Sequence, residues 1–75
     1  MAQYESAATM SQLTDFYRQQ MEFLGWELDA DFKGRDDACF VYRRPTRCCV
    51  ITMRVSDNVT HVAIMYQSEF NNGII

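Results

Sequence analysis

The chain has 75 residues, of which 48% are hydrophobic and 23% are charged, and its net charge is -3. This length allows one domain, and the composition is typical of a folded globular protein rather than a disordered one. The acidic balance argues against nucleic acid as a partner, because duplex binding needs a clustered basic surface that displaces phosphate counterions. No apolar run approaches the roughly 18 residues that would span a bilayer.

The start of the chain and its cysteines bear on the compartment. No basic and apolar signal sequence opens the chain, which predicts a soluble protein of the cytoplasm. A domain excised from an exported parent would look the same, so the cell envelope stays the alternative. The cysteines at 39, 48 and 49 form no CxxC or Cys/His pairing. They predict small buried hydrophobes in a reducing compartment, and neither a disulfide, a metal site nor a cofactor is expected.

The first elements in the chain are a short strand and a helix. Residues 2–7 alternate weakly and predict an edge strand. Thr9 and Gln12 have the T-x-x-Q spacing of a capping box, which satisfies two backbone N–H groups at a helix start. An amphipathic helix is predicted over residues 10–24, ended by Gly25, because apolar residues recur there at helical spacing. These residues are Met10, Leu13, Phe16, Tyr17, Met21 and Leu24.

Strand patterns follow the helix at residues 26–32, 38–43, 47–55 and 60–67. Asp57 and Asn58 predict a tight turn before the last of them, since both residue types tolerate positive φ. We expect a single α+β domain over residues 1–67, followed by a tail at residues 68–75. Its predicted architecture is one amphipathic helix packed on an antiparallel sheet, in the order β-α-β-β-β.

The register of the strands predicts which residues share a face of the sheet. A two-residue turn at Asp57 and Asn58 pairs Met53 with Val62, Ile51 with Ile64, and Cys49 with Tyr66. A turn centred on Pro45 pairs Cys39 with Ile51, and Val41 with Cys49. The face that the helix covers is then expected to hold Trp26, Leu28, Ala30, Phe32, Cys39, Val41, Cys49, Ile51, Met53, Val55, Val62, Ile64 and Tyr66.

The opposite face is too apolar for a sheet surface that only meets water, and it predicts a contact surface for a protein partner or a second copy. The alternative is that the tail folds over it. The expected partner-binding residues are Phe40, Tyr42, Val50, Thr52, Ala63 and Met65. Cys48 and His61 are expected on the same face.

A second hypothesis rests on arginines that lie close together in the sequence. It is nucleic-acid or other anionic-ligand binding, with Tyr42 and Phe40 as rings on which a base would stack. The expected anion-binding residues are Arg43, Arg44, Arg47 and Arg54.

No group of residues has the spacing of a catalytic or metal site. His61 is the single histidine, and without an orienting partner it is typical of a surface residue. Cys48 raises a third hypothesis, a thiol-based enzyme or redox sensor, although reactive cysteines are typical of helix N-termini and clefts. The acidic residues at 29–37 lack the spacing of a calcium loop, and no nucleotide-binding or hydrolase motif is present. We expect a non-enzymatic module.

Phe16-Tyr17-Arg18 followed by Gly25-Trp26 resembles a small bacterial α+β domain of unknown function that is often found in lipoproteins. The counterpart of its hairpin would be residues 40–43 and 47–52. The resemblance covers about residues 4–66 and implies the fold rather than an activity. The sequence departs from the pattern at Arg44-Pro45-Thr46, where a glycine-type turn is usual, in its cysteines and in lacking a lipoprotein signal.

Overall fold

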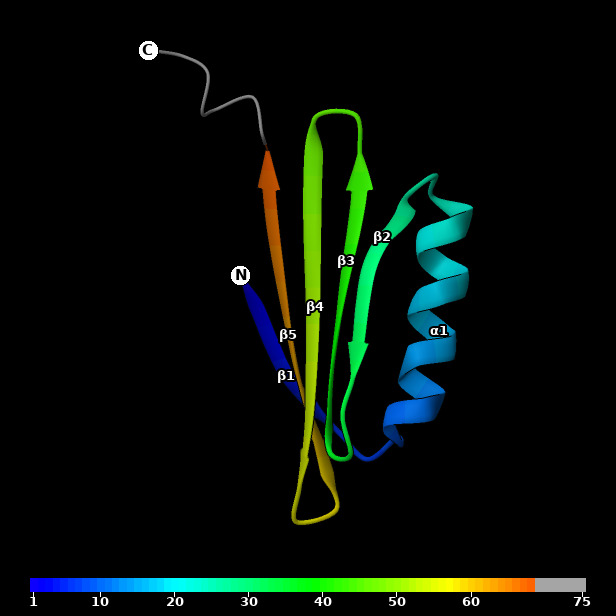
Figure 1. Cartoon of the computed structure of the whole chain (residues 1–75). Helices are drawn as coiled ribbons and strands as arrows, with labels where there is room; N and C mark the ends of the chain where they lie inside the picture. Colours follow the sequence, from blue (N-terminus) through cyan, green and yellow to red (C-terminus); the bar gives the residue numbers. More distant parts are fainter. Residues whose placement is uncertain (69–75) are drawn as a thin grey trace.

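The computed structural model of the protein describes residues 1–68. Figure 1 shows one helix lying against one side of a five-stranded antiparallel sheet. The elements are β1 (Ala2–Ser6), α1 (Met10–Phe23), β2 (Glu27–Lys33), β3 (Asp37–Arg44), β4 (Arg47–Ser56) and β5 (Val59–Ser68). The strand order in the sheet is β1-β5-β4-β3-β2. The long strand β4 therefore lies at the centre, and β1 and β2 form the two edges.

The fold is broadly α+β, but the predicted order β-α-β-β-β is wrong. Four strands follow the helix, at the four places where strand patterns were found, so the predicted order holds one strand too few and the order is β-α-β-β-β-β. The sheet has room for all of them because β1 pairs with β5 at one edge, while β2 pairs with β3 at the other. The predicted tail began at Ser68, which belongs to β5, and its remaining part lies outside the described residues.

The predicted capping box and the glycine that ends the helix are confirmed, although α1 ends at Phe23, one residue before the predicted end. The backbone N–H of Gln12 donates to the Thr9 hydroxyl at 3.1 Å, and the Thr9 N–H donates to the Gln12 side-chain oxygen at 2.9 Å. At the other end, Gly25 has φ +87°, and the Trp26 N–H donates to the Met21 carbonyl at 2.9 Å. This bond and the positive φ are the marks of a Schellman cap, which turns the chain sharply from α1 into β2.

The β4–β5 hairpin has the predicted register. Met53 lies opposite Val62, Ile51 opposite Ile64, and Cys49 opposite Tyr66. Asp57 and Asn58 have φ values of 55° and 63°, which is the conformation of a type I′ turn. A two-residue turn of this kind fixes the pairing of every residue behind it.

The predicted register of the β3–β4 hairpin is wrong by one residue. Arg44 pairs with Arg47, so the turn consists of Pro45 and Thr46 and is not centred on Pro45. Phe40 therefore lies opposite Ile51, where Cys39 was expected. Since side chains alternate along a strand, this single step exchanges the two faces of β3.

The predicted face of β2 is only half right. The register between β2 and β3 shifts between Leu28 and Ala30, which marks a β-bulge at Asp29. Leu28 lies opposite the buried Tyr42 on the helix side, whereas Phe32 lies opposite Cys39 on the other side. The extra residue thus places Ala30 and Phe32 on the face opposite the helix, whereas the sequence predicted them on the face that the helix covers.

The core lies between α1 and the central strands, on one side of the sheet only. Its buried apolar side chains are Leu13, Met21, Ala38, Phe40, Tyr42, Cys49, Ile51, Met53 and Val62. The buried Thr60 hydroxyl donates to the Ala8 carbonyl at 2.9 Å and ties the β1–α1 connection to β5. Phe16 and Leu24 of the predicted helical stripe are 52% and 53% exposed, so the helix packs through a narrower stripe than expected.

Candidate interaction surface

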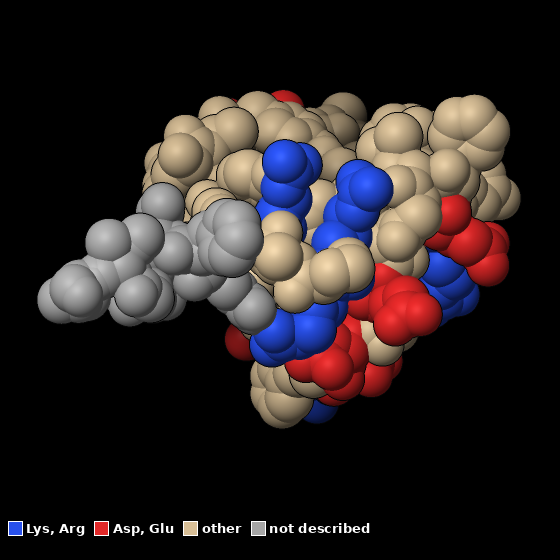
Figure 2. Space-filling view, turned by 90° about the horizontal axis from the view of Figure 1, so that it is seen from above, with Lys and Arg blue, Asp and Glu red and all other residues tan. Residues whose placement is uncertain are grey.

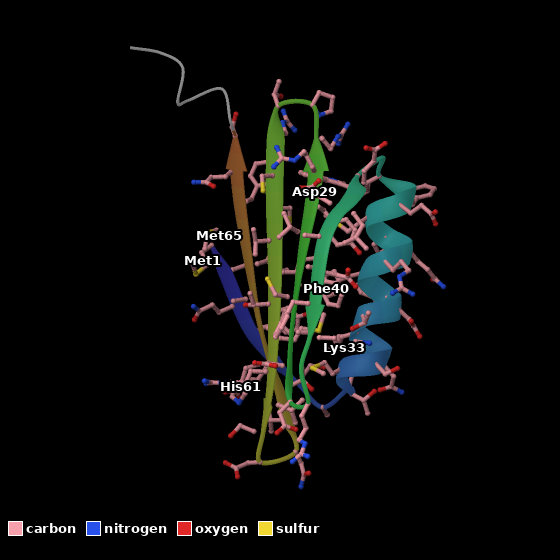
Figure 3. All side chains as sticks on the ribbon, in the orientation of Figure 1. Met1, Asp29, Lys33, Phe40, His61 and Met65 are labelled. Atoms are coloured by element: carbon pink, nitrogen blue, oxygen red, sulfur yellow. The ribbon has the colours of Figure 1, made fainter. Side chains whose placement is uncertain are left out.

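The face of the sheet that points away from α1 is called the outer face from here on. Figure 3 shows the two sides: Phe40 and Lys33 point toward the helix, and His61 and Met65 point away from it. Pairing and alternation assign the remaining side chains. The central side chains of the outer face are Ala30, Phe32, Cys39, Val41, Cys48, Val50, Thr52, His61, Ala63 and Met65. Arg43 and Arg54 lie on the same face toward the ends of β3 and β4, and Gln3 and Glu5 of β1 lie beside β5.

The centre of the outer face is apolar and uncovered. Val41, Val50 and Ala63 are half-buried, although no described element lies over them, because each is shielded by its neighbours within the sheet. Phe32 and Met65 are 63% and 43% exposed. A continuous apolar sheet surface of this kind is typical of a contact site rather than a solvated face.

An open groove of about 800 Å³ crosses the lower part of the outer face. Phe32 and Cys39 line it from β2 and β3, and His61 and Ala63 line it from β5. An exposed ring thus lies at the β2 side of the groove, and at the other side the His61 imidazole is followed by Gln3 and Glu5 of β1.

Two pairs of charged or titratable side chains flank the apolar centre. At the β1–β5 side, the His61 Nδ1 lies 3.5 Å from a Glu5 carboxylate oxygen. At the β2–β3 side, the Arg43 Nε lies 3.4 Å from an Asp29 carboxylate oxygen. An apolar centre with a polar rim is the usual anatomy of a protein interface.

Four of the six predicted partner residues lie on the outer face, namely Val50, Thr52, Ala63 and Met65. Phe40 and Tyr42 do not, because the register of β3 places them under the helix, where they are 3% and 5% exposed. Phe32, Cys39 and Val41 take their place. A two-residue turn at Pro45 and Thr46 would have identified Cys39 and Val41 from the sequence, whereas no signal marks the bulge that exposes Phe32.

The four arginines of the second hypothesis do not form one cluster. Arg43 and Arg54 directly follow the buried Tyr42 and Met53, so their side chains point to the outer face. Arg44 and Arg47 lie two residues from the buried Tyr42 and Cys49, so their side chains point to the helix side. Phe40 and Tyr42 are buried and cannot serve as stacking rings. One nucleic-acid surface containing all six residues is therefore not formed.

The remaining chemistry-bearing side chains are dispersed. Cys39, Cys48 and Cys49 are free thiols, and burial raises the pKa of the Cys49 thiol. Within residues 1–68, no group of His, Cys, Asp or Glu side chains is arranged to hold a metal ion. In the same range, no helix has the length and apolarity needed to cross a membrane.

Comparison of the chain with protein-family models, with curated proteins and with solved structures returned no significant match. The resemblance to a lipoprotein-associated bacterial domain accordingly stays an expectation from the sequence.

Proposed function

We propose that this chain is a non-enzymatic interaction module that self-associates through its outer face. The observation that carries the proposal is the row of apolar side chains across β3, β4 and β5 over which no described element packs. Leaving such a surface in water costs about 25 cal/mol for each Å² of apolar area, and a second copy would remove that cost.

The size of the face supports a partner of similar shape. β4 and β5 have ten residues each, in a sheet of five strands. At about 3.3 Å per residue and 4.8 Å between strands, the face measures at most roughly 800 Å². This area is about what each partner contributes to a stable interface. Because β1 and β2 are shorter, we expect a dimer that dissociates on dilution.

The rim supports a second copy as the partner. In a two-fold dimer the same patch meets itself, so it must tolerate its own charge pattern. Each rim pair combines a carboxylate with a basic group, Glu5 with His61 and Asp29 with Arg43. Two copies would thus meet without a surface of one sign facing itself.

The test is the solution mass by light scattering, from low micromolar to near-millimolar protein under reducing conditions. We expect a shift from monomer to dimer as the concentration rises. Met65→Lys should keep the protein monomeric, because it places a charge in the apolar centre, and Val50→Asp should do the same. A monomer at every concentration would contradict self-association.

Phe23→Lys is the matched control. Phe23 is 85% exposed on α1, away from the outer face, so this change adds the same charge at an apolar surface position. It should leave the dimer intact. If Phe23→Lys abolished the dimer and Met65→Lys did not, the interface would lie on the helix and the proposal would be wrong.

We also propose the cytoplasm as the compartment, with the cell envelope as the alternative. Cys39 and Cys48 are free, half-buried thiols on the outer face. Such thiols persist where the environment is reducing.

A further inference from the structure

A second surface lies on the helix side of the sheet, at the end that carries the β3–β4 turn. There the Trp26 and Tyr66 rings meet edge to face, with centroids 6.0 Å apart. Trp26 packs against the core, whereas Tyr66 is 53% exposed. Trp26 directly precedes β2, and Tyr66 belongs to β5. The two rings together form an aromatic surface at this end of the sheet, which is called the aromatic floor from here on.

An arginine lies over each ring of this floor. The Arg44 guanidinium carbon is 5.5 Å from the Trp26 ring centroid, and the Arg47 guanidinium carbon is 5.9 Å from the Tyr66 ring centroid. The two arginines are direct cross-strand partners, so they leave the sheet side by side on the same face. Figure 2 looks down on this end and shows basic side chains gathered around the turn, with acidic side chains beside them.

The positive charges of Arg44 and Arg47 have no carboxylate partner among residues 1–68. Two like charges at paired positions repel each other, which makes this arrangement costly without a shared anion. A guanidinium that lies over a ring keeps its N–H donors available for a ligand. The contact with the ring already restricts the arginine side chain, so ligand binding costs less conformational entropy.

We propose that Arg44, Arg47 and the Trp26–Tyr66 floor form a binding site for a phosphate monoester. One tetrahedral phosphoryl group offers three oxygens and close to two negative charges at neutral pH, which matches two forked donors better than a single carboxylate does. The site is independent of the outer face, because its side chains point to the other side of the sheet.

The surroundings favour one phosphoryl group over a polymer of phosphates. The whole chain carries a net charge of -3, and the other arginine near the turn, Arg43, has Asp29 beside it. A long polyanion would gain little beyond these two contacts and would meet the acidic side chains nearby. A free phosphate ester and a phosphorylated side chain share the chemistry that the site recognises.

Trp26 provides a direct readout, because it is the only tryptophan in the chain. We would titrate O-phosphoserine, a phosphoserine peptide and inorganic phosphate into the protein and follow Trp26 fluorescence. A saturable change is expected. Tighter binding of the peptide than of O-phosphoserine would identify a phosphorylated side chain as the ligand, and equal binding would identify the free ester.

Variants separate bidentate recognition from simple charge. Arg44→Gln and Arg47→Gln should each weaken binding about tenfold or more. Arg44→Lys should also weaken binding, because an ammonium keeps the positive charge but lacks the paired N–H donors of a guanidinium. Arg35→Gln, in the turn at the opposite end of β3, removes the same charge and should leave binding unchanged.

Three outcomes would overturn the proposal. The first is a titration without saturation for all three probes. The second is an equal loss of binding in Arg35→Gln, which would indicate a general charge effect. The third is binding of single-stranded DNA that tightens with its length while O-phosphoserine has no effect, which would indicate a nucleic-acid surface instead.

Discussion

Phe40 lies directly opposite Ile51 in the sheet, and both side chains face the helix. This pairing decides which surface of β3 belongs to the core. Had Cys39 occupied the position opposite Ile51, Phe40 and Tyr42 would lie on the outer face and the core would lose its two largest β3 side chains.

Substitutions at neighbouring positions of β3 test this pairing. Phe40→Ala should lower the free energy of unfolding by about 3–5 kcal/mol, because it removes a ring that is 3% exposed and leaves a cavity. Val41→Ala, on the uncovered face, should cost the monomer about 1 kcal/mol or less. Urea denaturation at dilute protein measures both values, and a larger loss for Val41→Ala would reverse the assignment of the faces.

The β4–β5 turn should be sensitive to side-chain shape. Asn58 has φ 63°, which a β-branched residue avoids. Asn58→Val should therefore lower the free energy of unfolding by about 1–2 kcal/mol, whereas Asn58→Gly should cost little because glycine adopts this conformation freely. Thermal denaturation of both variants measures the difference, and equal melting temperatures would be inconsistent with a type I′ turn.

Thiol alkylation should report on the outer face at single-residue resolution. In concentrated wild-type protein, Cys39 and Cys48 should react slowly, because the second copy of the proposed dimer would cover them. They should react faster in Met65→Lys. Cys49 should stay slow in both proteins, since it is 6% exposed and burial raises the pKa of its thiol. Mass spectrometry after timed alkylation gives the three rates, and identical rates for Cys48 in the two proteins would count against the dimer.

Stability should fall in alkaline solution. Burial, together with the hydrogen bond between the Tyr17 and Tyr4 hydroxyls, raises the pKa of Tyr17 above its ordinary value of 10.0. The unfolded chain then loses this proton before the folded protein does, so the contribution is complete below about pH 10 and is lost as the pH rises beyond it. Tyr17→Phe should lessen the alkaline loss, as measured by urea midpoints, and an equal loss in this variant and the wild type would contradict the role of Tyr17.

The helix and the last hairpin could be predicted from the sequence because local chemistry specifies them. Thr9 and Gln12 cap each other, Gly25 takes the positive φ that ends the helix, and Asp57 with Asn58 sets the register of β4 and β5. In each case one short motif determines the local geometry independently of the rest of the chain.

The faces of β3 and β2 could not be predicted for a physical reason. Residues 38–42 are apolar on both sides, so their pattern does not distinguish a turn centred on Pro45 from a two-residue turn. Leu28, Ala30 and Phe32 alternate perfectly, and the bulge at Asp29 places Phe32 on the other face from Leu28. The candidate site was therefore found at its β4 and β5 positions and missed at its β2 and β3 positions.

The bulge at Asp29 also bears on how far assembly can proceed. An outermost strand presents unpaired N–H and C=O groups that can template the addition of further chains, and natural proteins interrupt such strands with bulges or keep them short. Here β2 carries the bulge, and β1 has only five residues. Growth by strand addition is thereby discouraged at both ends of the sheet. Copies that meet through their outer faces would stop at two, as a closed pair rather than a fibre.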